Sequence, residues 1–507
     1  MNPRVHPRAL RRAIFTCISL LALILLTSHA LAQTAPAPAS AAASAPAITA
    51  VTSASTSPTD PAAVAGDTAW MLTSSALVML MVPGLALFYA GMVRRKNVLG
   101  TMMHSMAALG IIGVEWVVIG YAMAFGKDQH GIVGWDPELL FLKGVTPNLF
   151  HAGTSTPELV FIMFQGMFAI ITPALITGAF AERVKFSAFA LFTLLWGILI
   201  YNPLAHWVWG GGWLAPAAAG DTSLHIGAID FAGGTVVHIS AGFSALVCAL
   251  YLGKRIGFPH NVLQPNSLVL TMLGAGLLWF GWFGFNGGSA VGINNPNFGI
   301  AAVAFTTTQI AAAAGGMAWL IAEWMKHGRP TSLGFASGLV AGLVAITPAS
   351  GYVAPYAAII IGTAAGLVCY GAVVLKTKLG YDDSLDAFGV HGVGGFLGAL
   401  LTGIFATKAF NAAGADGLLY GNAPQFTSQL IAASAAAIFG AMGTLILLVI
   451  VDKLVGFRIS REVEIEGMDA GIHGEQGWML ESLPAPSVEM PGSIGSQPAR
   501  STVHQHV

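Results

Sequence analysis

The sequence predicts an all-α polytopic membrane protein that crosses the bilayer eleven times. Of its 507 residues, 55% are hydrophobic and only 9% are charged, whereas soluble domains have about a quarter of their residues charged. The apolar residues stand in long blocks, most of them near the ~20 residues that a helix needs to span the bilayer core. The basic residues between these blocks fall almost entirely in alternate connections, which is the pattern of a membrane topology.

Residues 1–32 are predicted to be a signal peptide. A short apolar core, Ile14–Leu26, is followed by a small-x-small cleavage site at Ala30–Ala32. An uncleaved membrane anchor is the alternative. Residues 33–66 consist mainly of Ala, Pro, Ser and Thr with little charge, a composition that cannot bury a core and predicts a disordered periplasmic leader. The basic residues before the apolar core are Arg4, Arg8, Arg11 and Arg12.

The membrane domain is predicted over residues 67–457, and a tail follows over 458–507. Eleven apolar blocks in this domain are each expected to form one helix. The blocks are 68–93, 98–125, 158–181, 187–202, 231–253, 267–285, 299–325, 333–349, 353–375, 387–407 and 427–451.

The connections between the blocks predict the orientation of the chain. One alternating set, together with Lys453, Arg458 and Arg461 after the last block, holds fourteen Lys and Arg residues, and the opposite set holds three. Because basic loops stay in the cytoplasm, we expect a cytoplasmic C-terminus and a periplasmic mature N-terminus. The three residues on the outer side are Lys127, Lys143 and Lys408.

Eleven helices can be divided into five, five and one. Transporters often repeat a helical unit in inverted orientation, with the functional site where the halves meet. The first five blocks begin outside and the next five begin inside, so the count permits such an inversion, although no internal sequence repeat is evident. The predicted fold is therefore a five-plus-five inverted pseudo-repeat with one additional helix.

Two histidines lie inside apolar blocks, where an ionisable side chain is costly and hence a candidate functional group. His238 lies in the fifth block and His391 in the tenth, the equivalent members of the two predicted halves. Each has an aspartate upstream, Asp230 and Asp386. A metal site is one alternative, but no close ligand spacing accompanies the histidines. We expect paired imidazoles in an apolar path, and no cofactor.

An aromatic cluster is predicted near the outer ends of the helices. Phe164 and Phe168 share one helix face because they are four residues apart, Trp209 follows the fourth block, and the sixth block ends with aromatic residues shortly before Ser289. Aromatic faces attract cations. An ordinary interfacial belt of aromatic residues is the alternative, but the glycines around this cluster favour a binding site for a cation.

Five long motifs closely resemble the Amt branch of the Amt/Mep/Rh family of ammonium transporters. They occur in the family's order, and the similarity extends from about residue 68 to residue 481, so the resemblance is specific. It implies a homotrimer in the bacterial inner membrane, with one pore through each subunit, that takes up ammonium for nitrogen assimilation. The motifs are Phe168–Arg183, Ala205–Gly212, Asp230–His238, Gly281–Asn286 and Asp386–Val393.

The resemblance also implies roles for single residues. Those expected to bind ammonium at the outer side are Phe164, Phe168, Trp209 and Ser289. Phe168 and Phe285 resemble the stacked rings that gate the pore. His238 and His391 resemble the twin histidines of the conduction path, with Trp282 beside them. Asp230 and Asp386 are expected to support the structure rather than to bind ligand.

The tail after the last block resembles the family's regulatory tail. By composition alone it is a solvated acidic end, but the strings Glu466–Asp469 and His473–Glu475 favour the regulatory interpretation. The resemblance implies a cytoplasmic PII-type signal-transduction protein as partner. The tail residues expected to carry this role are Gly467, Asp469, His473 and Glu475.

Two other classes of protein remain as alternatives. An ammonium sensor would use the same fold to bind ligand and signal, but no attached signalling domain follows the last block. An intramembrane metalloenzyme would use both histidines and their aspartates. The net charge of −1 gives no sign of a nucleic-acid partner. Glu115 departs from the family pattern, because an uncharged residue is expected in the middle of the second block.

Overall fold

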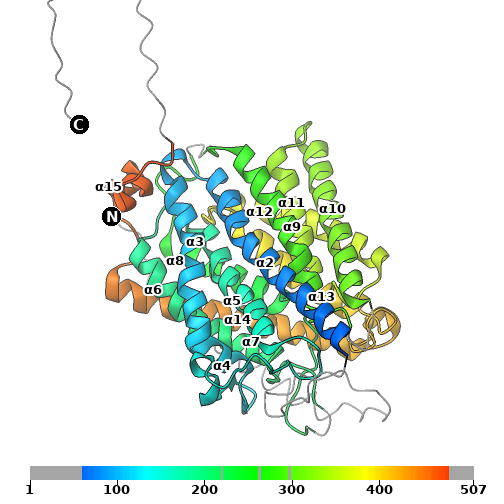
Figure 1. Ribbon diagram of the computed structural model, residues 1–507. Helices are drawn as coiled ribbons and strands as arrows, with labels where there is room; N and C mark the ends of the chain where they lie inside the picture. The colour runs from blue at the N-terminus through cyan, green and yellow to red at the C-terminus, as the bar shows by residue number, and fades with distance from the viewer. Residues whose placement is uncertain (1–59, 219–220, 261–263, 295–298, 479–507) are drawn as a thin grey trace, which may run out of the picture.

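The computed structural model describes residues 60–218, 221–260, 264–294 and 299–478 and is a bundle of helices. Figure 1 shows α15 at one end of the bundle and α4 and α7 at the other. Ten helices of the described residues are long and apolar enough to cross a membrane, and α11 is a shorter apolar helix. Each of the eleven predicted blocks contains one of these helices, so the all-helical polytopic fold is confirmed.

The spanning helices, with the π-helical or 3-10 segments that continue some of them, have the following bounds. They are α2 (Pro61–Met92), η1 (Arg95–Asn97), α3 (Val98–Glu115), η2 (Trp116–Gly120), α4 (Tyr121–Phe125), α5 (Glu158–Phe180), α6 (Phe186–Trp196), η4 (Gly197–Tyr201), α7 (Asn202–Val208), η5 (Gly234–Ile239), α8 (Ser240–Leu252), α9 (Leu268–Gly288), α10 (Ile300–His327), α11 (Ser332–Ile346), α12 (Pro355–Leu379), η6 (Phe388–Gly392), α13 (Val393–Phe405) and α14 (Ala423–Val455).

The remaining elements lie in the connections and the tail. A two-stranded antiparallel hairpin in the α4–α5 connection pairs Asp128 with Gly134, and the sequence analysis did not predict it. These elements are β1 (Asp128–Gln129), β2 (Val133–Gly134), η3 (Pro137–Leu142), η7 (Leu418–Tyr420), α15 (Arg461–Glu466) and η8 (Asp469–His473).

The first helix begins earlier than the sequence analysis placed it. We assigned residues up to 66 to a disordered leader, but α2 begins at Pro61. Asp60 explains the start, because its side chain accepts a hydrogen bond from the Ala62 backbone N–H at 2.9 Å and so acts as an N-cap. Proline at the first helical position favours the same boundary. The predicted signal peptide and most of the leader, residues 1–59, lie outside the described residues.

Small residues allow the helices to pack backbone against backbone. A Cβ atom added to Gly274 of α9 would lie 2.3 Å from the Phe88 nitrogen of α2. The same addition to Gly362 of α12 would lie 2.3 Å from the Ala311 carbonyl oxygen of α10. No side chain fits in such contacts, so glycine is required where these helices cross.

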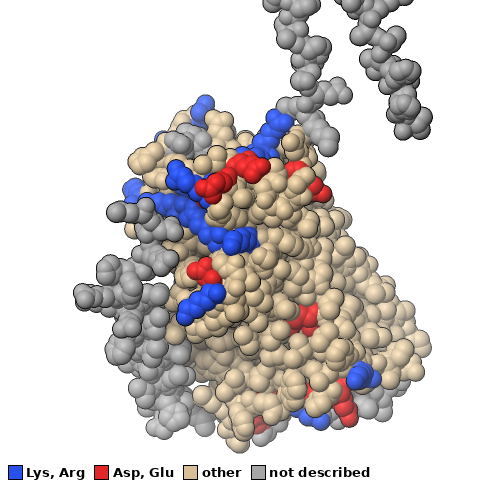
Figure 2. Space-filling model, turned by 90° about the vertical axis from the view of Figure 1, so that its left-hand side faces the viewer, with Lys and Arg blue, Asp and Glu red and all other residues tan. Residues whose placement is uncertain are grey.

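The surface of the bundle has a charged region near one end and an uncharged zone over most of the rest. In Figure 2, Lys and Arg side chains gather mainly near the end where α15 lies, and a broad zone of uncharged residues covers most of the remaining face. Exposed apolar side chains such as Val269, Phe280 and Ile359 belong to the spanning helices α9 and α12. A lipid bilayer is the environment that an apolar belt of this kind requires.

Candidate functional site

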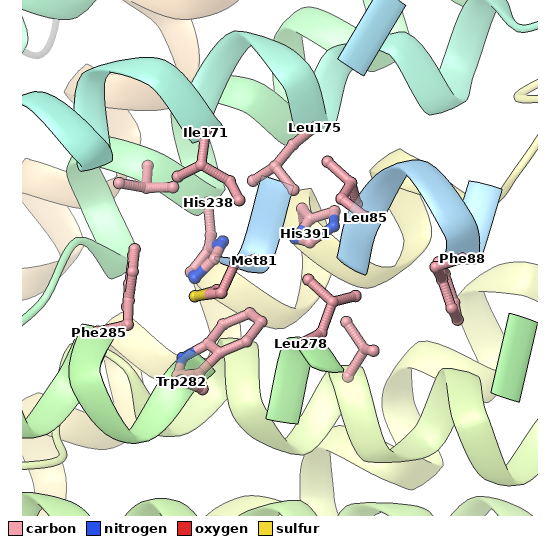
Figure 3. A pocket seen from close by; sticks show the side chains of 12 residues that line it. Met81, Leu85, Phe88, Ile171, Leu175, His238, Leu278, Trp282, Phe285 and His391 are labelled. Carbon is pink, nitrogen blue, oxygen red and sulfur yellow. The ribbon is translucent and has the colours of Figure 1, made fainter. Parts of the chain in front are cut away.

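A narrow apolar cavity lies in the middle of the bundle. Apart from two histidines and one tryptophan, only apolar side chains line it. Figure 3 shows Phe285 and Phe88 at opposite ends of the cavity, with His238 and His391 between them. The lining residues are Met81, Leu85, Phe88, Ile171, Leu175, Val237, His238, Leu278, Trp282, Phe285, Val340 and His391.

His238 is positioned by a π-helical turn that an aspartate holds. The turn is η5, and it leads directly into α8. Asp230 accepts hydrogen bonds from four consecutive backbone N–H groups at 2.7–3.2 Å. These donors belong to Gly233, Gly234, Thr235 and Val236. The four groups have no partner within the helix itself, so the carboxylate fixes the start of the segment that carries the histidine.

His391 is positioned in the same way by Asp383, an aspartate that the sequence analysis did not select. The turn η6 leads into α13, and Asp383 accepts hydrogen bonds from the backbone N–H groups of Ala387 at 3.1 Å and Phe388 at 2.8 Å. Asp386, the residue that the sequence analysis selected, instead forms an ion pair with Lys376. The sequence analysis missed Asp383, although one signal was present: Asp383 and Asp230 each precede their histidine by eight residues.

The two imidazole rings face each other in the cavity. Their centroids are 5.3 Å apart and their planes differ by 19°. Both side chains are buried. Neither ring nitrogen of His238, nor Nδ1 of His391, has a hydrogen-bond partner among the residues that the structure describes. Buried polar atoms are nearly always paired, so these nitrogens are available to a polar molecule inside the cavity.

The close contact of the two histidine segments depends on two glycines. A Cβ added to Gly242 would lie 2.0 Å from the nitrogen of Gly392, the residue after His391. A Cβ added to Gly395 would lie 2.9 Å from the Cβ of His238. Each glycine follows its own histidine by four residues and contacts the segment of the other. The contacts are reciprocal, as two halves related by a pseudo-twofold axis would make them.

Aromatic rings close one end of the cavity. Phe168 and Phe285 are stacked, with centroids 4.1 Å apart and planes 17° apart, and the Phe285 ring centroid is 6.1 Å from that of His238. Trp282 stacks on His238 at 5.4 Å. Its indole Nε1–H donates a 2.9 Å hydrogen bond to Thr347 Oγ1 of the α11 C-cap. The sequence analysis did not select Thr347, which fixes the orientation of the tryptophan.

Three of the four predicted outer residues contact one another around Phe168. Trp209 lies edge-on to Phe168 at 5.9 Å, and Phe164 lies 4.9 Å from Phe168. A Cβ added to Gly288, the residue before Ser289, would lie 2.6 Å from the Phe164 ring. The Trp209 indole N–H donates to the Asp230 carbonyl oxygen at 2.9 Å. The outer cluster is therefore connected directly to the residue that caps η5.

Comparison with known proteins assigns the family. The family model described as Ammonium Transporter Family matches residues 69–478. The chain is 48% identical over 414 residues to an ammonium transporter of Bacillus subtilis, covering 82% of this chain and 98% of that protein. The chain belongs to the ammonium transporter family. It is also 47% identical to the ammonium transporter Amt1 of Archaeoglobus fulgidus, covering 81% of this chain and 98% of that protein.

Solved structures agree with this assignment. A crystal structure of Mep2 from Saccharomyces cerevisiae superposes with a TM-score of 0.71 at 35% identity, covering 78% of this chain and 88% of that one. A structure described as a sensor Amt protein superposes with a TM-score of 0.72 at 29% identity, covering 80% and 98%. This protein is thus an ammonium transporter of the Amt/Mep fold, and not an enzyme. The metalloenzyme alternative is excluded.

Proposed function

We propose that this transporter recruits ammonium at the aromatic cluster, removes a proton from it, and conducts ammonia past the two histidines. The observation that carries the proposal is an unbroken series of ring contacts from Trp209 to His391. Trp209 and Phe168 meet at the outer side, the Phe168–Phe285 stack follows, and the unpaired nitrogens of His238 and His391 lie behind it. The proposed site residues on the outer side are Phe164, Phe168, Trp209 and Ser289.

Selectivity follows from the chemistry of these groups. Ammonium and potassium have similar charge and size, so attraction to aromatic faces does not separate them. Ammonium donates hydrogen bonds, and a serine hydroxyl accepts them. Ser289 Oγ donates to the Phe285 carbonyl oxygen at 2.9 Å, which leaves the lone pairs of its oxygen free for a cation. A potassium ion has no proton to lose and would have to enter the apolar cavity as a charge.

The histidines suit the second half of this route. A charged group is unfavourable in an apolar cavity, whereas a neutral imidazole offers one donor and one acceptor nitrogen. Two stacked imidazoles, with nitrogens that no protein group occupies, supply polar contacts to ammonia without supplying charge. Asp230 and Asp383 act as positioning residues, because their carboxylates bind backbone N–H groups of the turns that carry the histidines.

The experiment that tests the route uses single and double variants in proteoliposomes. His238→Ala and His391→Ala are expected to change ammonium-driven currents and the selectivity for ammonium over potassium. Trp209→Leu and Ser289→Ala are expected to weaken saturation at low ammonium, each by at most about 2 kcal/mol. The combined effect of the last two should be less than additive, because both groups contact one cation. Wild-type currents and selectivity in both histidine variants would overturn the conduction path.

The geometry supports an inverted repeat of two five-helix halves. The supporting features are the equal spacing of aspartate and histidine in each half, the π-turns η5 and η6, and the reciprocal glycine contacts. The family resemblance adds a homotrimer with one pore in each subunit. Cross-linking or native mass spectrometry in detergent tests this assembly, and a monomeric protein with full transport activity would contradict it.

The proposed orientation places the end with α15 in the cytoplasm of a bacterial cell. The distribution of Lys and Arg supports it. The membrane domain then extends over residues 67–457, after a signal peptide at 1–32 and a periplasmic leader at 33–66 whose last residues belong to α2. Labelling of single cysteines introduced into the 126–134 and 456–460 connections tests the orientation, because only the first should react with an impermeant reagent added to whole cells.

We propose that the tail beyond residue 457 regulates transport by docking on the inner end of the bundle. The Met468 N–H donates to Asn97 Oδ1 at 2.8 Å, and Asp469 Oδ1 accepts from the Gly100 N–H at 2.8 Å. His473 lies edge-on to Phe186 of α6 at 5.5 Å. Gly467 has a φ of +118°, and its α-carbon is packed so closely that a Cβ would lie 2.5 Å from the Lys96 carbonyl oxygen. The tail therefore rests on the first turn of α3.

A PII-type protein is the proposed partner of this tail. The Glu475 N–H donates to the Asp469 carbonyl oxygen at 3.0 Å, which keeps the end of the described tail folded against α3. Deletion of residues 462–507 should leave a folded transporter that no longer responds to a PII-type protein, with reduced transport. A truncated transporter with full activity and normal inhibition by PII would contradict the regulatory role and leave the conduction path unaffected.

A further inference from the structure

A glutamate is buried in the membrane-spanning part of the bundle, away from the cavity. Glu115 is the last residue of α3, and only 4% of it is exposed. Its Oε1 accepts a 2.7 Å hydrogen bond from Nδ2 of Asn202, the first residue of α7. Among the described residues no ion pair includes Glu115. An ionised carboxylate would therefore be a buried charge without a counter-charge, which is highly unfavourable.

The surrounding backbone is shaped around this carboxyl group. The π-turn η2 begins at the residue after Glu115, and the π-turn η4 ends at the residue before Asn202. A Cβ added to Gly120 would lie 3.1 Å from each carboxyl oxygen, and one added to Gly197 would lie 3.6 Å from Oε2. Single π-turns within spanning helices often occur at functional sites. The two turns and the two glycines together form a close-fitting site for one carboxyl group.

The hydrogen-bonding groups of this site are short of a donor. Oε2 of Glu115 and Oδ1 of Asn202 are both buried, and neither has a partner among the residues that the structure describes. If the carboxyl were ionised, both atoms would be acceptors. The Tyr201 hydroxyl is buried without a partner as well. Tyr201, the last residue of η4, directly precedes Asn202 and is the nearby titratable side chain. Ile112 of α3 and Trp116 of η2 are the apolar neighbours of the carboxyl.

We propose that Glu115 is a proton-binding site and that the transporter holds this side chain as the neutral carboxylic acid. A proton taken from water onto Oε2 turns an acceptor into a donor. The acid and the Asn202 amide then form two hydrogen bonds, Nδ2–H to Oε1 and Oε2–H to Oδ1, between two planar groups of matching geometry. The proton removes the buried charge and fastens α3 to α7.

A monovalent cation is the competing occupant. Carboxylate, amide and hydroxyl oxygens are suitable ligands for a hard cation, and a bound cation would also neutralise the charge. The proton is favoured because the site already contains a hydrogen-bonded pair of planar groups that lacks only one donor. A cation would need several oxygens arranged around it at once, and Gly120 and Gly197 bring the backbone close to the carboxyl instead.

The test uses the complete transporter in lipid and three variants: Glu115→Gln, Glu115→Leu and Asn202→Leu. Infrared spectroscopy should detect the carbonyl band of an un-ionised carboxylic acid at neutral pH in the wild type. The band should disappear in Glu115→Gln and change position in Asn202→Leu, because the acid loses its amide partner. Glu115→Gln should keep the melting temperature of the wild type, since a glutamine amide supplies the same donor and acceptor. Glu115→Leu should lower it by several degrees.

Three results would overturn the proposal. The first is the absence of the acid band in the wild type, which would show an ionised carboxylate. The second is a band that persists in Glu115→Gln, because another group would then be its source. The third is a wild-type melting temperature that falls when sodium and potassium are replaced by a large organic cation, with no such fall in Glu115→Gln. That result would assign the site to a metal cation.

Discussion

The segments that carry His238 and His391 use the same construction in different surroundings. Both histidines lie in a π-turn at the start of a spanning helix, eight residues after an aspartate that binds the first backbone N–H groups. Asp230 accepts four such hydrogen bonds and Asp383 accepts two. The start of the first segment is bonded to Trp209 of the aromatic cluster. The start of the second segment lies among ion pairs at the opposite end of the bundle.

This difference shows how one kind of cap is adapted to the two ends of the bundle. At one end, the backbone carbonyl of Asp230 binds the Trp209 indole, so the cap of one histidine segment also orients the proposed ammonium site. At the other end, Asp382, next to Asp383, binds Arg183 and Arg255. The His238 segment is thus bonded to the cluster that we propose for ammonium recruitment, and the His391 segment to loops beside the proposed regulatory tail.

The largest expected effect is loss of an aspartate cap. Asp230→Ala leaves four buried N–H groups without an acceptor, and at about 1–3 kcal/mol for each unsatisfied group this exceeds the stability reserve of many proteins. Asp383→Ala leaves two, so its cost should be roughly half. Thermal unfolding in detergent and the yield of folded protein measure both. Equal losses would show that the two caps are equivalent despite their different hydrogen bonds.

Gly242 and Gly395 should also differ in how well they tolerate substitution by alanine. Gly242→Ala places a methyl group 2.0 Å from a backbone nitrogen, whereas Gly395→Ala places one 2.9 Å from the His238 side chain. Backbone cannot yield locally, so we expect Gly242→Ala to cost 3 kcal/mol or more and Gly395→Ala about 1–2 kcal/mol. The first should also reduce transport, because it separates the two rings. Gly276→Ala is a matched control in α9, since a Cβ there meets no atom within 4 Å.

Acidification should weaken the end of the bundle that holds Asp382 before the end that holds Asp230. Burial alone would raise the pKa of Glu182 and of Asp382. Nearby arginines outweigh burial and lower both pKa values. Arg255 and Arg94 act on Glu182, and Arg255 and Arg183 act on Asp382. A depressed pKa gives stability that is present above the ordinary values, 4.5 for Glu182 and 3.8 for Asp382, and is lost as the pH falls below them. Hydrogen exchange between pH 7 and pH 3 should show amides near Asp382 opening first. Earlier opening near Asp230 would contradict this.

The smallest effect should come from the support of Trp282. Thr347→Val removes the acceptor of the indole N–H and keeps the volume of the side chain, so we expect a loss of about 1–2 kcal/mol. The indole is then free to tilt away from His238. A decrease in ammonium flux, with an unchanged concentration for half-saturation, would agree with a role behind the outer site. Thr307→Val is a control of the same chemistry in α10, where the hydroxyl bonds to backbone carbonyl oxygens.

The sequence predicted the helices, which follow from the length of the apolar blocks, and the site residues, which follow from the family motifs. The eleven blocks each contain a helix. Of the residues chosen for the site, His238 contacts His391 and Trp282, and Phe168 contacts Phe164 and Trp209. The histidines were recognisable because a polar residue in a spanning helix is rare. The family motifs then connected them to the aromatic residues.

Other features could not be predicted because no residue type encodes them on its own. A π-turn is one extra residue within a helix, and η5 and η6 leave no periodic signal in sequences of glycine, valine and phenylalanine. The sequence analysis named Asp386, the first residue of the fifth motif, whereas the fold pairs Asp386 with Lys376 and uses Asp383 as the cap. The early start of α2 depends on a single capping interaction at Asp60.

The close backbone contacts at Gly242 and Gly395 set the distance between positions 238 and 391. Because the glycines hold the two segments in contact, the separation of positions 238 and 391 does not depend on which side chains occupy them. Any two residues placed there should face each other at a similar distance inside an apolar channel. The scaffold therefore offers a fixed two-point frame, in which chemistries other than paired imidazoles can be installed without redesigning the helices that present them.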